Sequence, residues 1–106
     1  PLNGVWATPP YLHNGAVPNV YSLLSQVEER PKKFYLGNRE YDPVNLGYRI
    51  DTLANGFEFD TSIRGNSNKG HEFSKEFRKD KEIQGVIGPA LSPDDRKALI
   101  EYLKTL

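Results

Sequence analysis

The stretch TPPYLHNGAVPN, from Thr8 to Asn19, contains two consecutive prolines, an aromatic residue, a histidine and an Asn-Gly pair. Residues that precede a proline are biased away from the helical region, and Asn14-Gly15 favours a turn with a positive φ. The stretch is therefore predicted to be an extended, irregular loop that carries apolar side chains. His13, one of only two histidines in the chain, lies at its centre.

The residues after this loop favour a short helix followed by brief strands. Asn19 is a typical N-cap residue, and segment 20–30 places apolar residues at helical spacing until Pro31 ends it, after roughly two to three turns. Three later segments are aromatic or β-branched and bounded by turn residues: KFYLG (33–37), LGYRI (46–50) and GFEFD (56–60). They predict two or three strands in a small antiparallel ribbon.

The last segment, LSPDDRKALIEYLKTL (91–106), has the strongest helix signals. Ser92 is predicted to be the N-cap and Pro93 the first helical residue, followed by two aspartates where the helix dipole favours negative charge. The charged segment EFSKEFRKDKEIQG (72–85) is predicted to be a weak helical turn or a surface excursion. An apolar stripe at helical spacing is predicted to lie on the core: Ala98, Leu99, Tyr102, Leu103 and Leu106.

Length and composition limit the possible folds and partners. The 106 residues correspond to one domain, 1–106, with a thin core. A net charge of zero, from 14 basic and 14 acidic side chains, directs the chain to neither nucleic acid nor an anionic membrane, and no apolar run is long enough to span a bilayer. Eight prolines, nine glycines and no cysteine predict a loop-rich domain without disulfides, so a metal or a cofactor is expected to stabilise its thin core. With no methionine and an opening of PLNGVW, the chain is expected to be a piece of a longer protein.

His71 lies in the second glycine-rich stretch, RGNSNKGHEF, and has two interpretations. It is either a solvated loop histidine or a ligand of a metal or haem iron. For a ligand, Gly65 and Gly70 would allow a close backbone approach to a flat cofactor. The polar residues 66–68 would supply hydrogen bonds that fix the loop and the ring tautomer.

His13 has the same two interpretations, with a different environment. Neighbouring apolar residues favour a buried, neutral histidine over one that contacts a cofactor edge. Two histidines alone do not make a convincing zinc site, because structural zinc takes four ligands. None of the serines lies in a nucleophile-elbow context, and phosphate-loop and dinucleotide motifs are absent, so no hydrolase motif supports an enzyme of that class.

Three parts of the sequence together resemble a known family. PLNGVWATPPYLHNGAVPNVYSLL resembles the segment of bacterial di-haem cytochrome c proteins, including the di-haem peroxidase and MauG-like enzymes, in which a TPPYLHNGS-type sequence precedes a short helix. The segments RPKKFYLGNREYDPVNLGY, GFEFDTSIRGNSNKGHEF and LSPDDRKALIEYLKTL resemble more closely the rubber oxygenase branch. The resemblance covers nearly the whole chain. It implies a mainly α, loop-rich cytochrome c-like domain portion with a small antiparallel β ribbon and a C-terminal amphipathic helix.

The resemblance also implies a site. In that branch haem c is held by the histidine of a Cys-x-x-Cys-His motif and, on its other face, by a loop histidine shortly before the last helix. His71 matches that distal axial ligand, and His13 matches a histidine close to the haem or its propionates. The last helix would pack across the haem-bearing helix. The other implied haem contacts are Trp6, Pro10, Tyr11, Leu12 and Tyr102.

The absence of cysteine departs from the family pattern. Covalent attachment of haem c is therefore expected on a segment outside this chain, either in the remainder of the same protein or in a companion chain. The implied function is the electron-transfer portion of a periplasmic or secreted di-haem oxidoreductase, not itself catalytic, which could also meet a redox partner protein. The alternative is a cofactor-free interaction or structural module.

Overall fold

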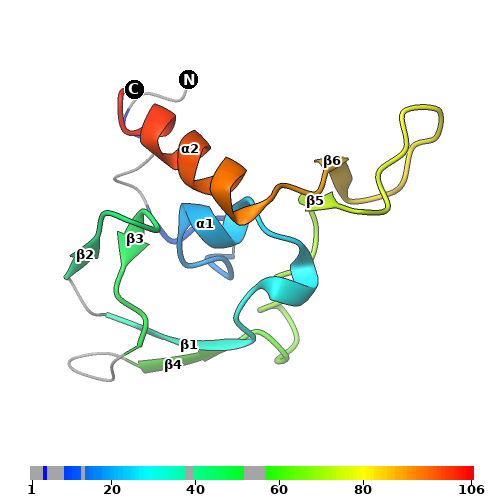
Figure 1. Ribbon diagram of the computed structural model, residues 1–106. Helices are drawn as coiled ribbons and strands as arrows, with labels where there is room; N and C mark the ends of the chain where they lie inside the picture. The colour runs from blue at the N-terminus through cyan, green and yellow to red at the C-terminus, as the bar shows by residue number, and fades with distance from the viewer. Residues whose placement is uncertain (1–3, 5–8, 13, 38–39, 52–56) are drawn as a thin grey trace.

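The computed structural model of the chain describes residues 4, 9–12, 14–37, 40–51 and 57–106. In Figure 1, the C-terminal helix lies across the first helix, and the longest strand pair forms the opposite edge of the molecule. The elements in chain order are α1 (Val20–Leu23), the 3-10 turn η2 (Val27–Glu29), β1 (Lys33–Leu36), β2 (Tyr41–Asp42), β3 (Gly47–Tyr48), β4 (Phe57–Asp60), β5 (Glu72–Ser74), β6 (Val86–Pro89) and α2 (Pro93–Leu103).

In the part of the chain that the structure describes, the strands form three separate pairs. β1 and β4 are antiparallel, with Phe34 opposite Phe59 and their rings stacked 5.3 Å apart between centroids. β2 and β3 are antiparallel, with Tyr41 opposite Tyr48 in an edge-to-face contact at 5.9 Å. β5 and β6 are parallel. The predicted strands 33–37, 46–50 and 56–60 are confirmed as β1, β3 and β4, but β3 pairs with the unpredicted β2 and does not join a common ribbon.

Helix α1 is shorter than predicted. Asn19 is the N-cap, and its side chain accepts a hydrogen bond from the Ser22 amide at 2.8 Å. At the end of the helix the Ser25 hydroxyl donates to the Tyr21 carbonyl at 2.7 Å, the carbonyl that the Ser25 amide would bond in a continuing helix, and Gln26 is already extended. The Ser25 amide bonds Ser22 instead. The predicted helix 20–30 is thus one turn followed by the separate turn η2.

The prediction of a mainly α fold is wrong. In the described part of the chain the two α-helices have four and 11 residues, whereas six short strands lie between Pro31 and Leu91. The physical reason is that prolines and glycines interrupt helical hydrogen bonding along this middle segment. Cross-strand aromatic pairs such as Phe34 with Phe59 stabilise local strand pairing there instead.

Among the described residues, the main core cluster is small and lies at the junction of the first loop and the two α-helices. The loop contributes through a bridge between Tyr11 and Val17, whose amides and carbonyls bond each other at 2.6 and 3.2 Å. Loop, helices and the β2–β3 turn therefore share one apolar centre. Its buried members are Tyr11, Val17, Val20, Leu24, Leu46 and Ile100.

Helix α2 begins as predicted, with Pro93 first and the Ser92 hydroxyl accepting from the Asp95 amide. The predicted core stripe is wrong in part, because Leu99 and Tyr102 are 38% and 60% exposed. Ile100 is buried instead, together with Arg96, four residues earlier on the same face. The burial of Arg96 orients the helix so that part of its apolar surface faces outward.

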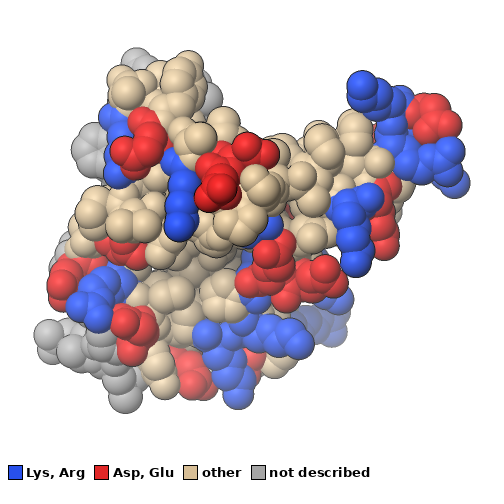
Figure 2. Space-filling model, viewed as in Figure 1, with Lys and Arg blue, Asp and Glu red and all other residues tan. Residues whose placement is uncertain are grey.

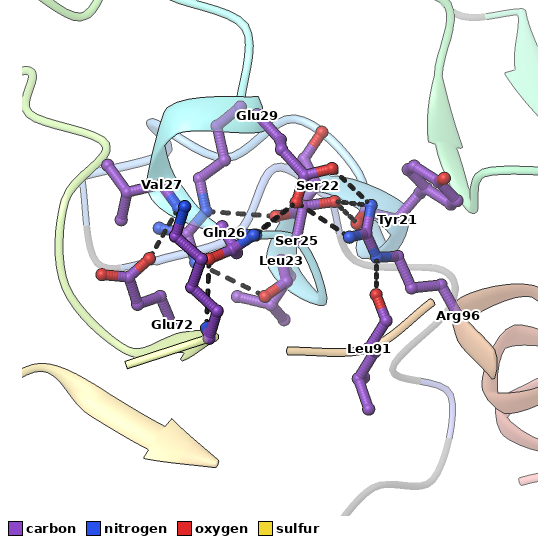
Figure 3. A network of polar contacts seen from close by, with 12 residues as sticks. Tyr21, Ser22, Leu23, Ser25, Gln26, Val27, Glu29, Glu72, Leu91 and Arg96 are labelled. Atoms are coloured by element: carbon purple, nitrogen blue, oxygen red, sulfur yellow. Dashed lines mark hydrogen bonds and ion pairs between the residues drawn. The ribbon is translucent and has the colours of Figure 1, made fainter. Parts of the chain in front are cut away.

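Arg96 joins α2 to the first half of the chain (Figure 3). Its guanidinium donates to both carboxylate oxygens of Glu29 at 2.8 and 3.0 Å, to the Ser25 hydroxyl and to the Leu91 carbonyl. It also lies 5.3 Å from the centre of the Tyr21 ring. The hydrogen bonds from Arg96 lower the pKa of Glu29, although partial burial opposes this. A fork-shaped, charge-assisted contact of this kind fixes both distance and angle between the two segments.

Residues 75–85 project from the body between β5 and β6 (Figure 1), and basic side chains cover much of their surface (Figure 2). Arg78 pairs with Asp80 at 2.9 Å near the tip. The predicted surface excursion is confirmed, whereas residues 72–74 form strand β5 and not a helical turn. None of the helices among the described residues is long and apolar enough to cross a membrane.

The raised pKa of Tyr11 predicts that the stability of the fold decreases at alkaline pH. Burial, with a smaller contribution from Tyr41, raises its pKa from 10.0 to about 12. The folded state therefore favours the neutral phenol, so stability from this group is complete below pH 10 and declines between pH 10 and 12. The loss amounts to about 3 kcal/mol. Tyr11→Phe is expected to flatten the free energy of unfolding over this range, and Tyr102→Phe, at an exposed tyrosine, is the control whose profile should follow the native protein.

Candidate functional site

His71 ends a loop of residues 65–71, the histidine loop, just before β5. Its backbone has a φ of +50°, and the preceding Gly70 has a φ of +100°. A left-handed conformation is uncommon for a residue with a side chain, although histidine is enriched among the exceptions. The His71 side chain is exposed, and no described residue hydrogen-bonds its ring. The loop therefore presents a free imidazole on an unusual backbone.

Arg30 holds this backbone from the inside of the molecule. It is 2% exposed, and within the described residues no carboxylate forms an ion pair with it. Burial lowers its pKa, and the charge of Glu72 partly offsets this. The guanidinium instead donates to five backbone carbonyls: Asn68 at 2.5 Å, Gly70, His71 and Ser22 at 3.1 Å, and Leu23 at 3.4 Å.

Asn14 brings the two histidine-bearing segments together. Its side-chain amide donates to the Gly65 and Ser67 carbonyls at 3.3 and 2.8 Å, and its oxygen accepts from the Ala16 amide. The residue next to His13 therefore contacts the histidine loop directly. The sequence pattern indicated two separate glycine-rich loops, and the structure joins them.

Polar side chains inside the histidine loop bond to other segments and so help to fix the loop, whereas none of the hydrogen bonds of residues 66–68 within the described chain reaches the His71 ring. Asn66 donates to the Asp60 carbonyl and Asn68 to the Pro31 carbonyl, both at 3.2 Å. Gly65 and Gly70 meet nothing within 4 Å at the position of an added Cβ. Within the described chain, their role is therefore the positive φ that each adopts, +90° and +100°, and not a close packing contact.

The residues that follow His71 are fixed to η2 (Figure 3). The Glu72 carboxylate accepts a hydrogen bond from the Val27 amide at 2.8 Å, and the Gln26 side chain accepts from the Lys75 amide at 3.2 Å. The Glu72 amide donates to the Gly85 carbonyl at 2.7 Å. Together with Arg30, these bonds hold the backbone on both sides of His71.

An open hollow of about 470 Å³ lies beside His71. Two glycines form part of its wall, and a Cβ on Gly85 would lie 3.7 Å from the Cα of Gly70. The wall thus includes bare backbone beside an imidazole, which suits the approach of a flat group. The hollow is lined by Val27, Lys69, Gly70, His71, Glu72, Gln84 and Gly85.

The other predicted contacts occupy different environments. Tyr11 is buried in the core at 9% exposed, Leu12 packs against the core with a φ of +65°, and Pro10 is exposed. His13 and Trp6 lie outside the described residues. Tyr102 is in the last turn of α2, at the end of that helix remote from β5 in Figure 1.

Two of the polar residues that build the site were not predicted from the sequence. Arg30 was placed at the end of a helix, and Asn14 was assigned only a turn. The signal for Arg30 is weak, since its loop acceptors lie 38 to 41 residues later in the chain. Asn14 likewise bonds residues 51 and 53 positions away.

Comparison with known families concerns the first third of the chain, which includes part of this site. Residues 1–35 match the family model described as RoxA-like, cytochrome c-like. This match supports a cytochrome c-like relationship for the segment. The segment includes the TPPYLHNGAVPN stretch, α1 and Arg30, whereas His71 lies beyond the matched residues. The cytochrome c-like relationship suggests haem c as the cofactor.

Two curated proteins are similar to nearly the whole chain. The uncharacterized protein y4iJ of Sinorhizobium fredii (strain NBRC 101917 / NGR234) is 63% identical over all 106 residues, which make up 17% of that protein. The uncharacterized protein y4iM of the same organism is 37% identical over 115 residues, covering 98% of this chain and 26% of that protein. The chain therefore spans about a sixth to a quarter of these two relatives.

The residues of the site fit a haem in one specific respect. Among the described residues, no group of three or more histidine, cysteine or acidic side chains is arranged to hold a metal ion. A haem iron takes its equatorial ligands from the porphyrin, so the protein has to supply only one or two axial ligands and no larger ligand cluster. One outward-facing imidazole on a fixed backbone meets that need. The cysteines for covalent attachment are not in this chain.

Proposed function

We propose that this chain is the haem-binding, electron-transfer portion of a di-haem c-type oxidoreductase, in which His71 supplies the distal axial ligand. The observation that carries the proposal is the exposed His71 imidazole, without a partner among the described residues, on a backbone held by Arg30. The cytochrome c-like relationship of residues 1–35 supports it. Haem supplies reversible one-electron transfer when it is bound.

The roles of the chain's own residues follow from their positions. His71 would hold the haem iron through a ring nitrogen, while Arg30 and Asn14 hold the loop that carries this side chain. With a histidine of the attachment motif as a second ligand, this haem would supply electron transfer and would not bind a substrate. Peroxide or oxygen chemistry then belongs to the second haem of the parent protein, and this chain relays electrons.

We also propose that the chain packs against the segment that carries Cys-x-x-Cys-His, in the remainder of the same protein or in a companion chain. Support comes from α2, whose Leu99 and Tyr102 side chains are 38% and 60% exposed. An apolar helix face of this kind is suited to pack on a second helix. The resemblance further implies a location in the periplasm or outside the cell, where a redox partner protein could receive or supply electrons.

Visible absorption spectra of the full-length protein, oxidised and then reduced with dithionite, test the cofactor. A Soret band with sharp low-spin α and β bands is expected, together with a haem-modified Cys-x-x-Cys-His peptide on mass spectrometry of the digest. A folded but colourless protein would contradict the proposal and favour the cofactor-free interaction module.

A further inference from the structure

We propose that Arg30 is the positioning residue for His71, and that it fixes the left-handed backbone that aims the imidazole outward. The inference rests on the proposed function, in which His71 binds haem iron. Arg30 does not reach the ligand ring. It acts on the main chain behind the ring, through carbonyls of the histidine loop.

The first step concerns backbone strain. Gly70 and His71 both have positive φ values, of +100° and +50°. A left-handed backbone is disfavoured for a residue with a Cβ, so His71 keeps it only where the surroundings over-determine it. The two terminal nitrogens of Arg30 donate to the Gly70 and His71 carbonyls, each at 3.1 Å. These bonds hold the two left-handed residues themselves.

The second step concerns the choice of residue. Arg30 is 2% exposed and has no ion-pair partner among the described residues. Hydrogen bonds to backbone carbonyls therefore offset the cost of removing its charge from water. A buried charge of this kind is seldom the most stable solution for a fold. Guanidinium offers five donors in a rigid plane, which matches five carbonyls from two distant segments. A lysine offers three donors from one point and cannot span the same set.

The test uses Arg30→Gln and Arg30→Lys in the full-length haem protein. Loss of an outer partner of a metal ligand weakens metal affinity or activity by about 10- to 100-fold. In the Arg30→Gln variant, added cyanide is therefore expected to displace His71 from the iron at a lower concentration than in the native protein, by about the same factor. Arg30→Lys is expected to fall between this variant and the native protein.

Arg96→Gln is the matched control. Arg96 is likewise buried, at 4% exposed, and hydrogen-bonds Ser25, Glu29 and Leu91, but no bond joins it to the histidine loop. Its loss weakens the fold without releasing His71. At matched stability, Arg96→Gln should therefore show the cyanide midpoint of the native protein, and only Arg30→Gln should show faster amide hydrogen exchange in residues 68–72.

The possible outcomes are distinct. If His71→Ala alters the haem spectrum but the two arginine variants show equal cyanide midpoints and equal exchange, the positioning role is wrong and the ligand assignment stands. If His71→Ala leaves the spectrum unchanged, both the ligand assignment and this inference fail. A lower cyanide midpoint and faster exchange in Arg30→Gln alone, with partial restoration by Arg30→Lys, support the inference.

Discussion

Replacing His71 by alanine is expected to convert a low-spin, six-coordinate haem of the full-length protein into a high-spin or ligand-exchanged one. Alanine removes the ring nitrogen that is proposed to bind the iron, and axial ligand identity is one of the protein's main controls over haem properties. The change is measured by absorption and electron paramagnetic resonance spectra, as a difference from the native protein so that the second haem cancels. An unchanged low-spin spectrum would rule out His71 as the ligand.

The control for this variant is His13→Ala. His13 is expected to lie close to the haem or its propionates without binding the iron, so its loss should leave coordination intact and loosen the pocket. A spin-state change in His13→Ala equal to that in His71→Ala would contradict the separate roles assigned to the two histidines.

Replacing Arg96 by glutamine is expected to lower the free energy of unfolding by about 3 kcal/mol. This value is near the low end for breaking a buried ion pair, because the Glu29 side chain is 38% exposed and can be hydrated again. The guanidinium joins α2 to η2 through Glu29 and Ser25. Chemical denaturation measures the loss. Lys104→Gln on the same helix breaks an exposed pair with Glu101 and should change stability by at most about 1 kcal/mol. Equal effects of the two substitutions would contradict the role given to Arg96.

The Arg96–Glu29 contact also predicts a response to acid. Hydrogen bonding from Arg96 lowers the pKa of Glu29, so the stabilisation is present above the ordinary glutamate pKa and is lost as pH falls through the lowered value. Glu29→Gln is therefore expected to reduce the pH dependence of unfolding at acidic pH. The same substitution made in Arg96→Gln should have a much smaller effect, and an undiminished effect would show that the two groups are not coupled.

Local signals in the sequence predicted local structure well. Asn19 and Ser92 were both predicted to be N-caps from residue type and position, and in the structure the side-chain oxygen of each accepts a bond from the amide three residues later. The strands around Phe34 and Phe59 were also recognisable, because short aromatic segments between turn residues favour cross-strand pairing. The polar residues 66–68 likewise indicated a loop fixed by its own side chains.

Long-range contacts account for what the sequence did not predict. The short α1 is an exception, because the Ser25 hydroxyl bonds the Tyr21 carbonyl only four residues earlier. The burial of Arg96 turns Leu99 and Tyr102 outward, although all three lie on a helix whose bounds were predicted correctly. Arg30 contacts carbonyls about 40 residues away, and no local pattern encodes such a partner. The prediction of a mainly α fold came from the family resemblance, and the local strand signals of this chain were the better guide.

The most direct test of the proposed ligand is a crystal structure of the full-length, haem-loaded protein, with the iron located by its anomalous scattering. The proposal predicts iron at bonding distance from a ring nitrogen of His71, with Arg30 still bonded to the Gly70 and His71 carbonyls. A haem whose iron has both axial ligands from other residues, with His71 in solvent, would contradict it.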